Sequence, residues 1–203
     1  LEVQAQAESR YLALQARIRP HFLFNTLNTL SALIRKDPRL AESLVDDLWD
    51  LFRVSLEKRH RLVPLREEID TALCYLNTEQ VRVGERLKIE RYNPVIALSV
   101  PVPVLSLQPL VENAVHHGIM HRDDEGTIRI STELHSGGSG VEYLTLTVTN
   151  PVPDVPVPSQ GSRLALTNLT ERLRIAYEGR ASLSSERQEH QFRIDMRLPV
   201  VGD

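Results

Sequence analysis

Two amphipathic stretches near the start of the chain meet at Asp37-Pro38, and this break constrains the fold more than any other feature. Proline is favoured at the first position of a helix and aspartate just before it, so a second helix is predicted to begin at Pro38. On both sides of the break the apolar residues recur at steps of three and four, the spacing of one buried helix face. The residues of this stripe are Leu23, Leu27, Leu30, Ile34, Leu40, Leu44, Leu48 and Leu51.

The second helix carries further apolar residues, Val45, Phe52 and Leu56, which make its stripe wider than one neighbouring helix can cover. A lone hairpin of two such helices leaves apolar surface in water on both members. A second copy of the chain covers that surface at the least cost, as a four-helix bundle around a two-fold axis. We therefore predict a homodimer, in which residues 1–62 form an antiparallel helical hairpin that dimerises.

Helical and strand patterns alternate after Pro64, which predicts an α/β domain over residues 63–203. One helix should end before Gly84, and another should end near His117 with Gly118 as a left-handed cap. A further helix should begin with Ser162 as its N-cap. The predicted strands cover residues 87–92, 127–134, 141–149, 181–186 and 191–198. Four prolines between residues 151 and 158 predict a stiff loop.

The composition excludes several classes of protein. A net charge of -3 with 5% aromatic residues gives no basic surface and little material for base stacking, so a direct nucleic-acid partner is not expected. The single cysteine, Cys74, cannot form an internal disulfide, and a reducing, cytoplasmic setting is predicted. No apolar run approaches the roughly 20 residues that span a bilayer. Because the chain begins at Leu1 within a helical pattern, we expect it to be a fragment with a segment upstream.

Ten residues from Arg19 to Asn28 place one histidine, His21, directly after Pro20 in a stretch that otherwise reads as a packing stripe. With an unperturbed pKa near 6.5, an exposed histidine is mostly neutral at pH 7 and can act as a nucleophile toward phosphorus. The proline ring is expected to kink the helix and turn the next side chain outward. The alternative is a surface histidine beside a structural kink.

A second string, from Leu107 to Gly118, places the carboxamide of Asn113 on an apolar helix beside acidic and imidazole groups. An amide oxygen is a hard ligand of the kind that Mg²⁺ prefers. The histidines at 116, 117 and 121 could suggest a zinc site instead, but no acidic or cysteine ligand is placed to complete a tetrahedral set. Together the two strings suggest a phosphate donor site and a phosphate acceptor.

The string Pro20-His21-Phe22-Leu23-Phe24-Asn25, followed about 85 residues later by the string that contains Asn113, resembles the LytS-type bacterial sensor histidine kinases over nearly the whole chain. The resemblance implies a GHKL-type ATP-binding α/β sandwich with a mixed sheet, and Mg²⁺ at Asn113. It also implies autophosphorylation on His21 and transfer to an aspartate of a response regulator. Relatives of this kind carry an upstream membrane sensor, so the full-length protein is expected in the bacterial inner membrane.

The resemblance also assigns roles around the phosphoacceptor. Many histidine kinases have an acid directly after the acceptor, whereas this chain has Phe22, so another group must orient the imidazole. Glu112 is our candidate, although it could equally cap a helix or lie in solvent. Asn25, one helical turn after His21, could position a water for hydrolysis of the regulator's phospho-aspartate, or satisfy backbone groups near the kink.

For the nucleotide, Asn150 aligns with the adenine-recognising aspartate of the fold, and Val152 stands where a glycine is usual, so weaker ATP binding is expected. Other candidate contacts to the phosphates are His117, Gly161, Ser162, Asn168 and Arg172. Asn168 and Arg172 could instead belong to a polar outer face of their helix. The eroded glycine boxes look most like those of the alginate-regulating subtype. They leave two hypotheses: an active kinase, or a module that mainly docks or dephosphorylates its regulator.

Overall fold

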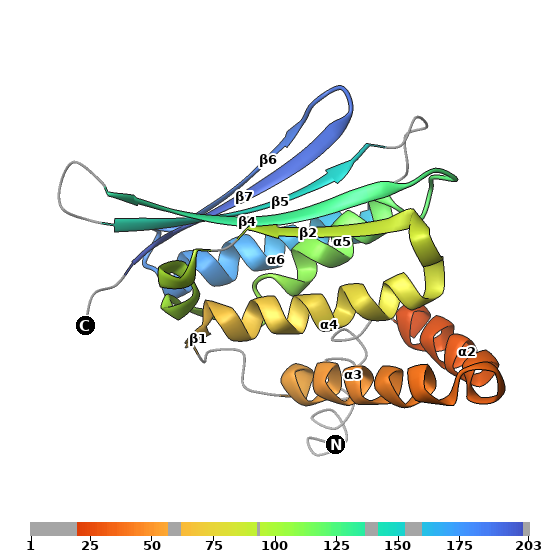
Figure 1. Ribbon diagram of the computed structural model, residues 1–203. Helices are drawn as coiled ribbons and strands as arrows, with labels where there is room; N and C mark the ends of the chain where they lie inside the picture. The colour runs from red at the N-terminus through yellow and green to blue at the C-terminus, as the bar shows by residue number, and fades with distance from the viewer. Residues whose placement is uncertain (1–19, 57–61, 93, 137–141, 153–159, 201–203) are drawn as a thin grey trace, which may run out of the picture. The chain divides into compact units, whose positions relative to one another are not determined.

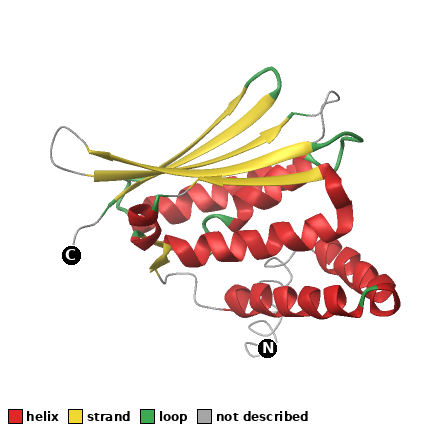
Figure 2. Cartoon of the chain, viewed as in Figure 1, coloured by secondary structure: helices red, strands yellow, loops and turns green. Residues whose placement is uncertain are grey.

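The computed structural model describes residues 20–56, 62–92, 94–136, 142–152 and 160–200 (Figure 1). The chain divides into two compact units, Leu1–Glu57 and Lys58–Asp203. The first unit contains a helical pair and the second a sheet backed by helices (Figure 2). The predicted loop of residues 153–158 lies outside the described residues, as does the chain before Pro20.

The first unit contains the two predicted helices, α2 over Pro20–Lys36 and α3 over Pro38–Leu56. The break at residue 37 is confirmed, and the backbone N–H of Leu40 donates to Oδ1 of Asp37 at 3.1 Å, as expected for an N-cap. Because α2 is described only from Pro20, the predicted kink lies outside the described residues. The two helices and the cap at Asp37 show that local sequence signals are enough to predict the hairpin.

The apolar stripe of this hairpin is only partly covered in the single chain. Leu44, Leu48 and Leu51 of α3 are buried. Phe24 is 66% exposed and Trp49 is 68% exposed. The other large apolar residues that remain exposed on the two helices are Leu27, Ile34, Leu40 and Val45. A single hairpin thus leaves the apolar surface that the sequence predicted it could not cover.

The second unit begins with β1 (Leu62–Pro64), α4 (Leu65–Val83), the 3₁₀ turn η1 (Gly84–Arg86), β2 (Leu87–Tyr92), the 3₁₀ turn η2 (Val95–Ser99) and β3 (Pro101–Pro103). It continues with α5 (Gln108–Gly118), β4 (Gly126–Ser136), β5 (Glu142–Pro151), α6 (Gln160–Ala176), β6 (Ser182–Arg187) and β7 (Gln191–Pro199). The five-stranded sheet has the order β2-β4-β5-β7-β6. Its β2–β4 pair is parallel and the other pairs are antiparallel, so the predicted mixed sheet is confirmed.

One face of the five-stranded sheet packs against α4, α5 and α6 (Figure 1). Alternate residues of the central strands form the core, and each buried aliphatic side chain contributes roughly 1.5–3 kcal/mol. These fully or nearly fully buried strand residues are Ile128, Ile130, Leu144, Leu146, Val148, Ile194, Met196 and Leu198. The period-two pattern of the sequence is therefore the pattern of burial in the sheet.

Two predicted helix caps are wrong. Gly118 is the last residue of α5, but the residues with positive φ in the described chain do not include it, and Ile119 after it has right-handed helical angles. The chain therefore leaves α5 without a left-handed cap. Helix α6 begins at Gln160, so Ser162 lies in its first turn and is not the N-cap. By contrast, Gly84 ends α4 as predicted, with φ of 68°.

Candidate functional site

The phosphoacceptor string lies in the first turns of α2. His21 is the second residue of the helix, and its side chain is outside the described part of the structure. Asn25 follows one turn later, half-buried, and its backbone carbonyl accepts a hydrogen bond from Oγ1 of Thr29 at 3.0 Å. Thr26 is buried and donates to the carbonyl of Phe22 at 2.8 Å. Threonine hydroxyls thus bond back to the helix on the face beside these candidates.

In the second unit, the structure brings the two asparagines of the predicted nucleotide site onto neighbouring elements. Asn113 lies in the middle of α5 and is 5% exposed, while Asn150 lies near the end of the central strand β5 and is 3% exposed. The two elements touch at Gly118, where an added Cβ would lie 2.6 Å from Nδ2 of Asn150. Since five residues of helix separate Asn113 from Gly118, the two carboxamides are connected through about 7.5 Å of helix axis.

The carboxamide of Asn150 is held in one orientation. Its Nδ2 donates to the carbonyl of Pro151 at 2.8 Å. The donor end is therefore used within the chain, and the Oδ1 end is the group that suits a purine amino group. Val152 is buried, and its backbone N–H donates to the carbonyl of His190 at 3.1 Å. The carbonyl of Val152 accepts a hydrogen bond from Nη1 of Arg122 at 2.9 Å. The end of β5 is thus fixed by several partners.

Glu112 is half-buried beside Asn113 and accepts a hydrogen bond from Nε2 of Gln108 at 3.0 Å. Gln108 is the first residue of α5, and its Oε1 is buried with no hydrogen-bond partner in the described part of the chain. A buried acceptor without a partner is uncommon and is compatible with a donor supplied by a ligand. His21 and Glu112 belong to different units.

The histidines after Asn113 form a ring cluster. The ring centroids of His116 and His117 are 4.7 Å apart, and those of His116 and His121 are 5.5 Å apart, both in edge-to-face arrangements. Among the described residues, no group of three or more histidine, cysteine or acidic side chains is arranged to hold a metal ion. His117 is half-buried at the end of α5.

The loop that leads into α5 is held from two sides, and the sequence did not predict either contact. On one side Glu68 of α4, 2% exposed, accepts backbone N–H groups at its carboxylate. The donors are Leu105 at 2.6 Å, Ser106 at 2.7 Å and Leu107 at 2.9 Å. From sequence alone, an acid in the first turn of a helix indicates only a favourable interaction with the helix dipole. Its partners lie 37 to 39 residues away.

On the other side of this loop lies Arg172 of α6. Its Nη1 donates to the carbonyl of Leu105 at 3.1 Å, and its Nη2 donates to the carbonyl of Val104. Leu105 has φ of 58°, a conformation that non-glycine residues adopt rarely, and the contacts on both sides hold it there. Burial raises the pKa of Glu68 above its ordinary value, while the backbone donors and the charge of Arg172 act in the opposite direction. We call these contacts the Glu68 clamp.

The remaining predicted contacts lie on α6. Asn168 is exposed, and Gly161 and Ser162 are in the first turn, with side-chain positions outside the described part of the structure. Arg172, predicted as a phosphate neighbour, holds the loop before α5, and α5 packs against α6. No helix in the described ranges is long and apolar enough to cross a membrane.

Comparison with solved structures identifies the fold. The histidine kinase domain of the blue-light activated histidine kinase from Erythrobacter litoralis EL346 matches 98% of this chain and 95% of its own, with a TM-score of 0.50 and 19% identity. The catalytic domain of histidine kinase ThkA matches 68% of this chain and 96% of its own, with a TM-score of 0.52 and 15% identity. The fold is that of a histidine kinase core.

Sequence comparison identifies the family. The family model described as histidine kinase matches residues 9–87. Sensor histidine kinase BtsS of Escherichia coli (strain K12) is 32% identical over 193 residues, which cover 95% of this chain and 34% of BtsS. Sensor protein LytS of Bacillus subtilis (strain 168) is 32% identical over 220 residues, covering 98% of this chain and 37% of LytS. The chain belongs to the LytS-type sensor histidine kinase family, and it spans about a third of the length of these relatives.

Proposed function

We propose that this chain is the kinase portion of a two-component sensor histidine kinase. It binds ATP with Mg²⁺, phosphorylates His21, and passes the phosphoryl group to an aspartate on the receiver domain of a response regulator. The hairpin, residues 1–62, acts as the dimerisation and phosphoacceptor domain, and residues 63–203 act as the GHKL-type ATP-binding domain. The setting is cytoplasmic, and the full-length protein is anchored in the bacterial inner membrane.

One observation supports this proposal most strongly, the direct packing of Gly118 of α5 against Asn150 at the end of β5. The contact connects the candidate metal ligand, Asn113, to the candidate adenine-recognising residue through one short helix. Both carboxamides are almost completely buried, and one of them is held by a hydrogen bond to the neighbouring carbonyl. Such rigid placement of a few polar groups is typical of nucleotide sites.

The residues present fit the two ligands. The amide oxygen of Asn113 is a hard ligand for Mg²⁺, and Oδ1 of Asn150 can accept from the adenine amino group. The phosphates are assigned to His117, Asn168 and the first turn of α6, where Gly161 and Ser162 contribute backbone N–H groups at a helix N-terminus. When bound, Mg²⁺ neutralises charge on the phosphate oxygens and orients them.

The chemistry at His21 is a phosphoryl transfer. The neutral imidazole forms a nitrogen–phosphorus bond to the γ-phosphorus as the bond to the bridging oxygen breaks and ADP leaves. Glu112 orients the imidazole by accepting a hydrogen bond from the N–H of the ring nitrogen that does not attack, because Phe22 cannot do so. The phosphoryl group then moves to a carboxylate oxygen of the regulator and regenerates neutral His21. In the opposing phosphatase activity, Asn25 positions a water that hydrolyses the regulator's phospho-aspartate and releases inorganic phosphate.

The homodimer rests on the apolar surface that the hairpin leaves exposed. Phe24 on α2 and Trp49 on α3 each expose about two thirds of their surface in the single chain. Large aromatic side chains are rarely left in water on both helices of a hairpin, whereas a bundle of two hairpins buries such residues. The dimer also supplies the four-helix surface on which a receiver domain would dock.

Incubation with γ-labelled ATP and Mg²⁺ tests the proposal. The parent chain should acquire acid-labile label, and His21→Gln should acquire none. His190→Gln serves as the matched control, because His190 is exposed in the turn between β6 and β7 and should retain the label. Labelling of His21→Gln at the parent level would contradict the proposal.

A second candidate function is a docking or phosphatase module that makes little use of ATP. The specific observation in its favour is the uncharged Asn150 together with Val152, which is buried at the end of β5. Titration with MgATP separates the two functions. A dissociation constant below about 1 mM, equivalent to about -4 kcal/mol, supports the kinase, and no binding in that range supports the docking module.

A further inference from the structure

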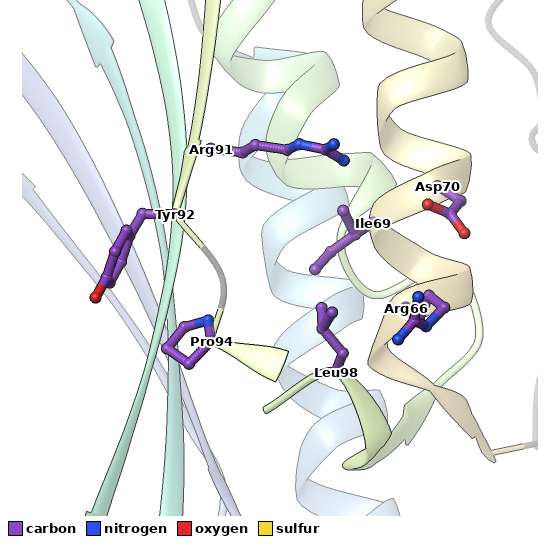
Figure 3. Close-up of a pocket in the computed structure, with 7 residues that line it drawn as sticks. All are labelled: Arg66, Ile69, Asp70, Arg91, Tyr92, Pro94 and Leu98. Atoms are coloured by element: carbon purple, nitrogen blue, oxygen red, sulfur yellow. The ribbon is translucent and has the colours of Figure 1, made fainter. Parts of the chain in front are cut away.

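A hollow of about 390 Å³ opens in the second unit, and none of the site residues described above lines it (Figure 3). It lies between the first two turns of α4, the end of β2 and the turn η2 (Figure 3). Its volume falls within the range of roughly 300–1,000 Å³ that is usual for small-molecule pockets. We call it the arginine hollow, because Arg66 and Arg91 are among the residues that line it.

Arg91 lies next to the end of β2, where the strand is exposed. In the parallel pair of β2 and β4, Ile89 lies opposite Ile128 and Arg91 lies opposite Ile130, so both side chains belong to the face that carries the core. The alternation of β2 therefore continues from apolar residues to a guanidinium. Figure 3 shows this side chain extending from the strand toward α4. Arg91 is exposed to solvent, so its guanidinium is accessible to a ligand that enters the hollow.

The opposite wall of the hollow comes from one face of α4. Arg66 and Asp70 are one turn apart on this helix, and the apolar Ile69 lies on the same face. Within the described residues, no ion pair involves Arg66, Asp70 or Arg91. Two cations and one carboxylate line the hollow, so its side chains carry an excess of positive charge. Guanidinium groups suit the planar oxygen pairs of carboxylate and phosphate anions.

The base of the hollow is apolar. Ile69 is 2% exposed and Leu98 of η2 is half-buried, and both line the hollow (Figure 3). Guanidinium groups above an apolar surface match a ligand with an anionic head and an apolar body. We propose that the arginine hollow is a second binding site, which holds a small organic anion. Arg66 and Arg91 bind its carboxylate or phosphate group, and Ile69 and Leu98 contact its apolar part.

Fluorescence titration of the whole chain with anilinonaphthalene sulfonate, an anionic probe with an aromatic body, tests the proposal. We expect the double variant R66Q/R91Q to bind this probe at least tenfold more weakly than the parent. The variant R187Q is the matched control, since Arg187 is an exposed arginine on β6, and it should bind as the parent does. Binding of Nile red, which is neutral, should not depend on either arginine.

Competition in the parent chain keeps the proposal testable even if the double variant does not fold. Phenyl phosphate and phenylbutyrate should both displace the anionic probe, and their relative strength tells whether phosphate or carboxylate is preferred. MgATP should leave the probe bound, because the nucleotide residues lie elsewhere on α5 and β5. Displacement by MgATP, or unchanged probe binding by a folded R66Q/R91Q, would overturn the proposal. Neither measurement depends on whether His21 becomes phosphorylated.

Discussion

The substitution Glu68→Ala provides the sharpest test of how the loop before α5 is held. The Glu68 carboxylate accepts three backbone N–H groups, those of residues 105, 106 and 107, at 2.6–2.9 Å. Alanine removes every one of these acceptors at once. The loop cannot replace them locally, because Arg172 on its other side binds carbonyl oxygens and offers only donors.

The magnitude follows from those three bonds. An N–H group left buried without an acceptor costs about 1–3 kcal/mol, and the lost desolvation penalty of the carboxylate offsets part of the sum. We therefore expect Glu68→Ala to lower the free energy of unfolding by about 3 kcal/mol. For a unit of this size, each kcal/mol lowers the melting temperature by roughly 2–4 °C, so the expected shift is about 6–12 °C.

The pH dependence adds an independent check through Glu68→Gln, which keeps one acceptor oxygen and cannot ionise. Burial raises the pKa of Glu68 above its ordinary value of 4.5, so the folded chain retains this proton to higher pH than the unfolded chain. The contribution of this proton to stability is complete below pH 4.5 and is lost as the pH rises through the raised pKa. Glu68→Gln should not show this loss of stability as the pH rises.

Chemical denaturation of the parent and both variants between pH 4 and pH 8 measures these effects. Glu67→Ala is the matched control, because Glu67 is exposed in the same turn of α4. If Glu68→Ala changes the free energy of unfolding by less than about 1 kcal/mol while the control behaves as the parent, the clamp does not hold the loop.

Three further outcomes are expected. Gly118→Ala places a Cβ 2.6 Å from Nδ2 and 2.8 Å from Cβ of Asn150, so it should destabilise the chain by about 1–3 kcal/mol in denaturant titration. A neutral result would mean that α5 and β5 separate easily. Tyr177→Phe should cost about 1 kcal/mol, because the buried hydroxyl donates to a backbone carbonyl at 3.1 Å. Burial raises the pKa of Tyr177 to about 12, so the parent should lose stability between pH 10 and pH 12 and the variant should not. Trp49→Asp should yield a monomer in sedimentation, whereas Glu42→Gln should not; a Trp49→Asp dimer would remove the bundle interface from the proposal.

Much of the fold was predictable because its signals are local. The break at Asp37-Pro38 needs only a cap and a proline, and the structure has both helices and the cap hydrogen bond. The five predicted strands of the sheet are all present, since alternation along a strand reports which side faces the core. The resemblance of the two motif strings then identified the family.

The predictions that failed concern groups whose partners are distant in the sequence. A glycine after a helix suggested a left-handed cap, but Gly118 is small because Asn150 packs against it. Nothing in the sequence indicated that the guanidinium of Arg172 binds carbonyls 67 and 68 residues away, while its predicted place beside phosphates stays a prediction. Glu68 was not singled out at all, because its three acceptor contacts exist only after α4 and the loop before α5 are packed together.

The sequence by itself determined the elements, the core and the family, since periodicity, prolines and short motifs act within a few residues. Only the tertiary structure decided which polar groups hold the loop before α5, why residue 118 must be glycine, and where two arginines face one hollow. The physical reason is that a hydrogen bond, a close backbone approach or a shared charge depends on distance in space. Residues far apart in the chain acquire that distance only through packing.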